Sequence, residues 1–371
     1  MSTVATHPHL HPTVRRSPYF PRTEAAGASD YMVYNWMYMP MAYGRDPRED
    51  YRAMVERVTL WDVGAERQCE LRGPDALALA DYLSPRRLDD LPVGGCRYTM
   101  PLDPRGRVMV EAIALRPFAD VVWISHASVD LDLWATGLAL ARGADVEVSQ
   151  PDVAPLQLQG PRALDVLAGL AEHDVATLPR FRCVPTKVAG VDVVVSNTGW
   201  SKEAGFELYP LGTERALELW DALVEAGEPH GLLVTGPVIH RAVEQGITDV
   251  QYRANSDMDP FEAGWGALLD LDGRDFVGRE ALLAIRERGP ARRTVGLALD
   301  GPPVPMMEEF WPVEVDGAPA GVARWVVWSY ALERNIAIAL VDAGCPDDAT
   351  FTVRAPDGPR TGSVHPIPFV A

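Results

Sequence analysis

The chain has 371 residues, 47% of them apolar, and carries a net charge of −18. This length predicts roughly two or three globular domains, and the negative charge disfavours a nucleic acid partner, because such binding depends on Lys and Arg side chains that neutralise phosphates. The sequence contains neither the roughly 18-residue apolar run of a membrane span nor an apolar N-terminal signal core, so we expect a cytoplasmic protein that binds neither nucleic acid nor membrane.

The four cysteines are scattered and form no C-x-x-C pair, which predicts buried thiols rather than a zinc site or a disulfide framework. The sequence also lacks the G-x-G-x-x-G, P-loop, G-x-S-x-G and H-E-x-x-H motifs. Their absence disfavours hydride transfer on a Rossmann domain, serine hydrolysis and zincin chemistry. We therefore expect no metal site.

After a flexible tail over residues 1–15, the first organised feature is an internal repeat. The octet 70–77 recurs as 157–164, and each copy reads as a strand, a Gly-Pro turn and a helix. Proline suits the first position of a helix, where its missing N–H is not needed. Apolar helices are expected at 77–83 and 164–170. The repeat predicts two related α+β lobes.

Further strands and helices alternate up to residue 289. Strands are expected at 108–115, 121–125 and 191–196, and helices at 130–141, 213–225, 238–245 and 279–287. Beyond this point short strands, separated by Pro, Gly and Asp, are expected at 294–299, 313–315, 320–327, 336–341 and 350–353. The sequence therefore predicts an α+β fold, with a two-lobed region over residues 16–289 and a C-terminal β-barrel-like domain over residues 290–371.

The run 196–209 sets an aromatic residue and a carboxylate on one short turn between two strand-like segments. Gly199 and Gly205 are expected to permit the tight reversal. A pterin ring presents two roughly parallel N–H donors to a single carboxylate, and an indole can cover its face. Glu207 and Trp200 fit these roles. The alternative is an ordinary hairpin with a solvated Glu207.

Several motifs follow one another along the chain. They are VTLWDVG at 58–64, LRGPD at 71–75, YTMPL at 98–102, LQGP at 158–161, GFE at 205–207, PFEAG at 260–264 and DFVGREAL at 275–282. Together they resemble the glycine-cleavage T-protein (aminomethyltransferase) superfamily. The runs EAAG at 24–27, VYN at 33–35, VGAERQ at 63–68 and GWSK at 199–202, where aminomethyltransferases typically read Gly-Tyr-Thr-Gly, are most similar to the dimethylsulfoniopropionate demethylase branch.

This resemblance implies a three-domain ring with tetrahydrofolate in a central channel, and transfer of a methyl or other one-carbon unit to N5 of the folate. It implies that the pterin ring lies against Glu207, near Trp200 and Tyr98. Lys202 and Arg241 are the further residues that we assign to the folate site by this resemblance.

Two departures from the family pattern bear on the chemistry. Where aminomethyltransferases carry a Gly-Gly-x-x-Asp-Asp run, this chain has Val110 in place of the first Asp and Glu111 in place of the second. The arginine of the family's Arg-Leu-Glu-Ala-Gly run aligns with Ala242, and Arg241 stands one position away, about 100° around a helix. Either Glu111 retains the acidic function or that chemistry is lost, and a role in glycine cleavage is disfavoured.

The methyl donor decides which groups the site needs. A sulfonium methyl is already activated because its leaving group departs neutral, so positioning alone can lower the barrier by up to about 7–11 kcal/mol. A methoxy donor expels an anion and needs a proton donor or an oxyanion stabiliser, for which Glu111, Tyr98 and Lys202 are the candidates. We take Glu111 and Tyr98 as the catalytic candidates.

Tyr34, Trp36 and Tyr38 alternate in a strand-like segment, which would place three rings on one face. Aromatic faces attract sulfonium and quaternary ammonium groups, so these residues are candidates for binding the methyl donor. A buried strand with ordinary aromatic packing is the alternative. Trp36 stands where the demethylase branch tends to carry a basic residue, which disfavours dimethylsulfoniopropionate itself.

These observations predict an enzyme, a tetrahydrofolate-dependent methyltransferase (demethylase) that acts on a small sulfonium or methoxy compound. Folate-dependent methylene or aminomethyl transfer is one alternative, and a non-catalytic folate-binding scaffold is another. The identity of the methyl donor and the oligomeric state stay open.

Overall fold

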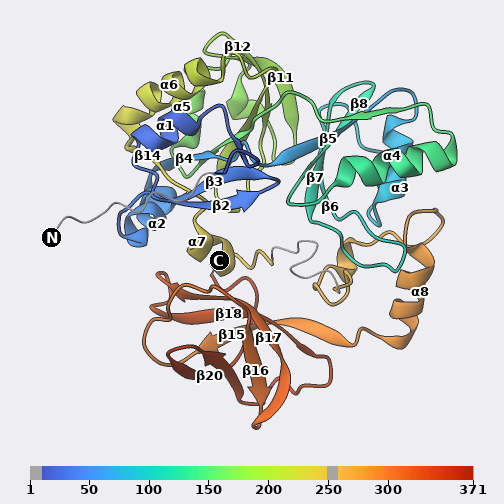
Figure 1. Ribbon diagram of the computed structural model, residues 1–371, viewed down its shortest axis with the longest axis vertical. Coiled ribbons are helices and arrows are strands. Elements are labelled where there is room, and N and C mark those ends of the chain that lie inside the picture. The colour runs from blue at the N-terminus through green and yellow to red at the C-terminus, as the bar shows by residue number, and fades with distance from the viewer. Residues whose placement is uncertain (1–10, 249–257, 371) are drawn as a thin grey trace. The chain divides into compact units, whose positions relative to one another are not determined.

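The computed structural model describes residues 11–248 and 258–370. The described chain divides into two compact units (Figure 1). The first contains residues 11–83, 88–99 and 110–238, and the second contains residues 84–87, 100–109 and the described part of 239–371. None of the helices in the described part of the chain combines the length and the apolar character that a bilayer crossing requires.

A six-stranded sheet forms one lobe of the first unit. Its order is β11 (Cys183–Val188), β12 (Val191–Ser196), β13 (Gly205–Pro210), β10 (Leu156–Gln159), β4 (Val58–Asp62) and β14 (Leu232–Val234). All neighbours are antiparallel except β14 and β4. The buried core of this lobe joins residues of these strands to α5 (Ala163–Leu167) and α6 (Ala216–Gly227). The β-branched run at 191–196 thus forms the strand that its composition predicts.

A five-stranded sheet forms the second lobe. Its order is β6 (Cys96–Thr99), β7 (Ala112–Phe118), β8 (Val121–His126), β5 (Arg67–Arg72) and β9 (Glu147–Ser149). The helices α3 (Ala76–Leu83) and α4 (Leu131–Arg142) pack on one face, where alternate residues of β5, β7 and β8 meet them in a shared core (Figure 1). The other face contributes Trp123 to a second cluster that includes Val194 and Tyr209.

The internal repeat reappears as two strand–turn–helix units, β5 to α3 and β10 to α5. Gly73 and Gly160 occupy equivalent turns with φ angles of +136° and +128°. A Cβ atom would lie 2.6 Å from a backbone oxygen at each position, that of Asp145 at Gly73 and that of Arg57 at Gly160. Only glycine fits such a turn. The second helix ends at Leu167, three residues before the predicted end.

A small sheet of order β1 (Arg15–Arg16), β3 (Met37–Ala42) and β2 (Asp30–Tyr34) completes the first unit, together with α1 (Phe20–Ala25) and α2 (Pro47–Glu56). Residues 1–10 of the predicted tail lie outside the described residues. Arg15, at the end of that predicted tail, pairs with Met37 in this sheet, so the chain is already part of the fold at this position.

The second unit contains α7 (Ile239–Glu244), α8 (Arg279–Arg288) and a closed β-barrel. The barrel strands, in spatial order, are β15 (Arg292–Leu299), β18 (Arg334–Asp342), β17 (Ala318–Ser329), β16 (Trp311–Val315), β19 (Phe351–Ala355) and β20 (Gly358–His365). The predicted α+β fold with a C-terminal barrel is confirmed. The strand β20 escaped prediction because its residues are mostly polar and small; its pairing with β15 and β19 places it.

Candidate active site

Glu207 lies at the centre of a buried polar group on the six-stranded sheet. Gln157 of β10 and Ser196 of β12 are its direct cross-strand partners, and Tyr209 follows two positions later on β13. Residues so placed share one face of a sheet. Glu207 accepts hydrogen bonds from Gln157 Nε2 (2.8 Å), from the Tyr209 hydroxyl (3.1 Å) and from Thr198. The side chain is therefore not solvated, and only 4% of its surface is exposed.

Burial raises the pKa of Glu207, and the hydrogen bonds from Thr198, Tyr209, Ser196 and Gln157 oppose that rise. Burial, together with the charge of Glu207, holds the pKa of Tyr209 well above its usual value, so the phenol remains a donor. The site thus buries a carboxyl group and surrounds it with hydrogen-bonding side chains that oppose the effect of burial on its pKa.

The turn that carries Trp200 packs closely on the neighbouring strand β10. A Cβ atom on Gly199 would meet the side-chain amide of Gln159, and one on Gly205 would lie 2.5 Å from the Leu158 carbonyl oxygen. The sequence predicts that Gly199 and Gly205 are needed for a tight reversal of the backbone. Their φ angles are negative or extended, so it is the close packing that requires glycine at both positions. The half-buried Trp200 follows directly after Gly199.

Lys202 takes a left-handed backbone conformation in this turn, with a φ angle of +60°. Such a conformation is strained for a residue with a side chain. Burial lowers the pKa of Lys202, and the nearby charge of Glu111 opposes this shift. The strained turn therefore holds an ammonium group in the field of Glu111.

Tyr98 and Glu111 are in direct contact in the five-stranded lobe. The Tyr98 hydroxyl donates a 2.9 Å hydrogen bond to Glu111 Oε2. Val110, which stands in place of the family's first aspartate, is completely buried. Of the two positions at which the family motif implies aspartates, only position 111 carries an acidic side chain in this protein, that of Glu111.

Glu66 is a further member of the site that the sequence pattern did not single out. Burial, and the nearby charges of Glu207 and Glu111, raise the pKa of Glu66 to about 8, against a hydrogen bond with Ser125. Glu66 is therefore mostly protonated at neutral pH. The sequence shows only a charged residue between a turn and a strand; its acidic neighbours, at positions 111 and 207, come from distant parts of the chain.

The three aromatic residues proposed for the methyl donor do not share one strand face. Tyr34 ends β2, Tyr38 lies on β3, and Trp36 occupies the turn between them with a φ angle of +59° and 62% exposure. Tyr34 pairs with Met37 and Val33 pairs with Tyr38, so Tyr34 and Tyr38 point to opposite faces of the hairpin. The predicted three-ring face is wrong, because a two-residue turn interrupts the alternation.

Arg241 belongs to the second unit, on α7. Its guanidinium Nη1 lies 3.2 Å from Glu244 Oε2, and the completely buried Glu244 also accepts a 2.6 Å hydrogen bond from Ser329 on the barrel. Arg241 therefore compensates a buried charge within its own unit, and its predicted contact with folate stays a prediction. In the described part of the chain, His, Cys, Asp and Glu side chains form no cluster of three or more suited to a metal ion.

Comparison with known proteins places the chain in a family. The GCVT N-terminal domain model matches residues 19–273, and the glycine cleavage T-protein C-terminal barrel domain model matches residues 292–370. The chain is 36% identical to the dimethylsulfoniopropionate demethylase DmdA of Ruegeria pomeroyi, over 95% of this chain and 96% of the relative. It is 33% identical to an aminomethyltransferase of Streptomyces avermitilis, over 82% and 83% of the two chains.

A solved structure shares the fold. The glycine cleavage system aminomethyltransferase T from Bartonella henselae superposes with a TM-score of 0.83 at 22% identity, covering 96% of this chain and 98% of that structure. The family predicted from the sequence motifs is confirmed by the two domain models, which match residues 19–273 and 292–370. The protein belongs to the glycine cleavage T-protein (aminomethyltransferase) family.

Proposed function

We propose that this protein is a demethylase that transfers a methyl group from a small sulfonium compound to N5 of tetrahydrofolate. One-carbon transfer with tetrahydrofolate is the chemistry of its family; the methyl unit and the sulfonium donor are the specific part of the proposal. The observation that carries it is the joint placement of three carboxyl groups, Glu66, Glu111 and Glu207, with Lys202 near Glu111 and Arg180 near Lys202. We further place the reaction in the cytoplasm.

The residues around Glu207 fit a pterin ring. Glu207 Oε1 accepts one described hydrogen bond, from Gln157, and a carboxylate oxygen has two lone pairs. Burial, together with the charges of Glu207 and Glu111, raises the pKa of Glu66 to about 8 and keeps this carboxyl largely un-ionised. A heterocycle with parallel N–H donors relieves the cost of burying the Glu207 carboxyl group. Glu207 would hold the pterin edge, with Trp200 on the same turn-bearing hairpin, and Glu66 would face the methyl donor.

The acids around Glu66 favour a cationic donor. Burial and the nearby charges of Glu207 and Glu111 raise the pKa of Glu66, so a sulfonium group beside this carboxyl would be attracted by these acids, whereas the cations Lys202 and Arg180 repel each other. A sulfonium methyl leaves behind a neutral thioether, so no acid is needed at the position that Val110 has made apolar. Several relatives are named aminomethyltransferases. Val110 stands where the sequence motif implies an aspartate, and this replacement disfavours aminomethyl transfer.

The remaining task of the protein is to orient the donor and to take up one proton. Tetrahydrofolate, when bound, supplies the nucleophilic N5. As the methyl carbon moves from sulfur to nitrogen, the sulfur keeps the electron pair of the broken bond, and the proton of N5 must leave. We assign its acceptance to Glu111 Oε2, which the Tyr98 hydroxyl orients through its 2.9 Å hydrogen bond. Val110 and the surrounding buried residues keep water from competing.

The product assay tests this function. Purified protein with tetrahydrofolate and a set of sulfonium donors, dimethylsulfoniopropionate among them, is expected to form 5-methyltetrahydrofolate and the matching thioether in equal amounts. Methoxy analogues of the same size should give at least 100-fold less product. A preference for methoxy donors would contradict the sulfonium assignment. Folate binding without turnover of any donor would favour the scaffold alternative.

Glu66 predicts how donor binding depends on pH. Because its pKa is raised to about 8, the carboxyl is protonated below that pH and ionised above it. A cation binds the ionised form better, so the affinity for a sulfonium compound should rise severalfold between pH 6.5 and pH 8.5. The Glu66→Gln variant, which mimics the protonated acid, should bind weakly at both pH values. Calorimetric titration measures both, and an identical pH dependence in the variant would remove Glu66 from the site.

A further inference from the structure

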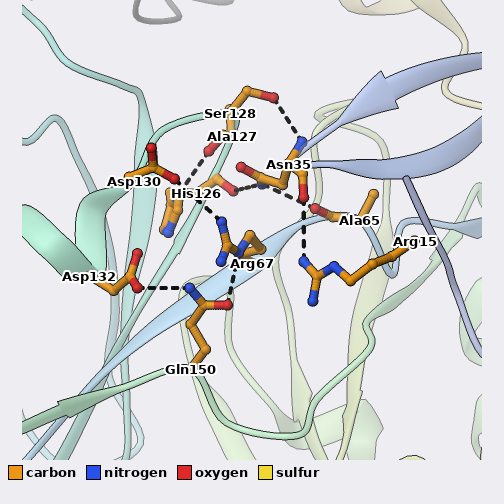
Figure 2. Close-up of polar contacts among 10 residues, drawn as sticks. All are labelled: Arg15, Asn35, Ala65, Arg67, His126, Ala127, Ser128, Asp130, Asp132 and Gln150. Atoms are coloured by element: carbon orange, nitrogen blue, oxygen red, sulfur yellow. Dashed lines mark hydrogen bonds and ion pairs between the residues drawn. The ribbon is translucent and has the colours of Figure 1, made fainter. Parts of the chain in front are cut away.

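Asn35, at the tip of the β2–β3 hairpin, is bound to segments from three other parts of the first unit (Figure 2). Its side-chain amide donates hydrogen bonds to the carbonyl oxygens of Ala65 (3.0 Å) and His126 (3.2 Å). Its backbone N–H donates to Ser128 Oγ (3.0 Å), and its carbonyl accepts from the Arg15 guanidinium (3.3 Å). Only 4% of Asn35 is exposed, and its two side-chain amide hydrogen bonds are buried.

The backbone at this tip is strained. Asn35 and Trp36 have φ angles of +48° and +59°, as a two-residue type I′ turn requires. Asparagine tolerates this conformation better than most residues, but tryptophan does not. A turn of this kind persists only where the surrounding structure fixes it, and the four hydrogen bonds of Asn35 provide that restraint. The buried position of Asn35 beside an exposed Trp36 shows which of the two residues anchors the tip.

The two carbonyls that Asn35 binds flank the acidic site. Ala65 directly precedes Glu66, and His126 directly follows Ser125, the serine that bonds the Glu66 carboxyl. Ser125 also accepts a 3.0 Å hydrogen bond from Gln68, which in turn binds the carbonyl of Glu66 at 3.1 Å. The side-chain amide of Asn35 therefore links the residue before Glu66 to the residue after Ser125.

Arg67 and His126 are two further ionisable groups near the tip. They are cross-strand partners, and His126 faces the opposite side of the sheet from Ser125, because successive residues of a strand alternate between the two faces. Arg67 lies near Asp130 and Gln150, and Gln150 binds Asp132 (Figure 2). Burial lowers the pKa of His126 to about 4, so this ring stays neutral. Glu207 and Glu111 are the acids that act on Glu66 itself.

We propose that Asn35 is a positioning residue for the active site, which fixes the Glu66 carboxyl against Ser125 by clamping Ala65 and His126 together. The inference rests on the proposed function for its catalytic meaning, because it assigns to Asn35 the control of a carboxyl that faces the methyl donor. All the residues that form this clamp lie in the first unit.

The ionisation of Glu66 provides a test that needs no turnover. Carbon-13 NMR of protein labelled at glutamate carboxyls follows the titration of Glu66, whose signal is identified by its loss in Glu66→Gln. In Asn35→Gly the left-handed turn is retained at no steric cost, but the two amide hydrogen bonds are lost. We expect the Glu66 titration midpoint to fall by at least one pH unit, because hydration of the released carboxyl removes the largest cause of its raised pKa and outweighs the loss of the Ser125 hydrogen bond, which alone would raise that pKa. Amide exchange in residues 63–68 and 121–128 should accelerate at least tenfold.

Asp316→Ala is the matched control. Asp316 also has a left-handed φ, of +50°, in a two-residue hairpin turn, but it is exposed and lies on the barrel. This variant should leave the Glu66 midpoint unchanged. If Asn35→Gly fails to fold, Ser128→Ala removes one of the four bonds and should shift the midpoint in the same direction by a smaller amount. A folded Asn35 or Ser128 variant with an unaltered midpoint overturns the clamp. A shifted midpoint in a protein that methylates no folate would leave the clamp standing and reject the proposed function.

Discussion

Glu207→Ala is expected to lower the free energy of unfolding by about 2–4 kcal/mol and to weaken tetrahydrofolate binding by about 1–3 kcal/mol. The stability effect arises because the side chains of Gln157, Thr198 and Tyr209 would keep donors pointed at a buried void. The binding effect arises because the pterin edge loses its acceptor. Urea denaturation measures the first quantity, and calorimetric titration of the folded variant measures the second.

A second buried glutamate separates these two effects. Glu70 is 7% exposed and accepts a 2.8 Å hydrogen bond from the Trp123 indole, so Glu70→Ala should also destabilise the first unit. Its folded form should bind folate with the affinity of the unsubstituted protein. If Glu207→Ala and Glu70→Ala lose stability alike and both retain full folate affinity, Glu207 is a structural residue and the assignment of the folate site fails.

Lys202→Gly is expected to change stability and activity in opposite directions. Glycine adopts a φ angle of +60° without strain, so the free energy of unfolding should rise by about 1 kcal/mol. The variant loses the ammonium group that lies in the field of Glu111, so methyl transfer should slow at least tenfold. Thermal or urea unfolding and the initial rate of 5-methyltetrahydrofolate formation are the two measurements.

Ala189 offers the control for this experiment. It has a φ angle of +50° in the β11–β12 hairpin, so Ala189→Gly should relieve comparable strain. This variant should leave the transfer rate unchanged. Full activity in Lys202→Gly would show that the lysine has no part in the chemistry, and a loss of stability would show that other contacts of Lys202 outweigh the backbone strain.

The sequence predicted those parts of the fold that depend on local patterns. The β-branched run at 191–196 is a strand, and the Gly-Pro turns mark both copies of the repeat. The strand β20 and the turn at Asn35 and Trp36 escaped prediction because neither has a local signal: β20 is polar, and an Asn-Trp pair lacks the glycine that usually marks a type I′ turn.

The candidate site was predictable only where a motif names its residues. Glu207 and Tyr98 stand in family motifs, Glu111 stands where the chain departs from one, and the structure gives each of them polar partners. Glu66 interacts with Glu111 and Glu207, which are more than 40 positions away in the sequence. The side-chain amide of Asn35 binds the carbonyls of Ala65 and His126, which are 30 and 91 positions away. Pairings at such separations depend on tertiary packing, which a single sequence does not reveal.

Closure of the barrel has a consequence for assembly. Each strand from β15 to β20 pairs with two neighbours, so none of the six barrel strands within residues 292–365 is an edge strand. A partner protein cannot extend this sheet by adding a strand of its own. Any association through this part of the molecule must therefore use side chains or loops, and its specificity will be set by surface chemistry rather than by strand register.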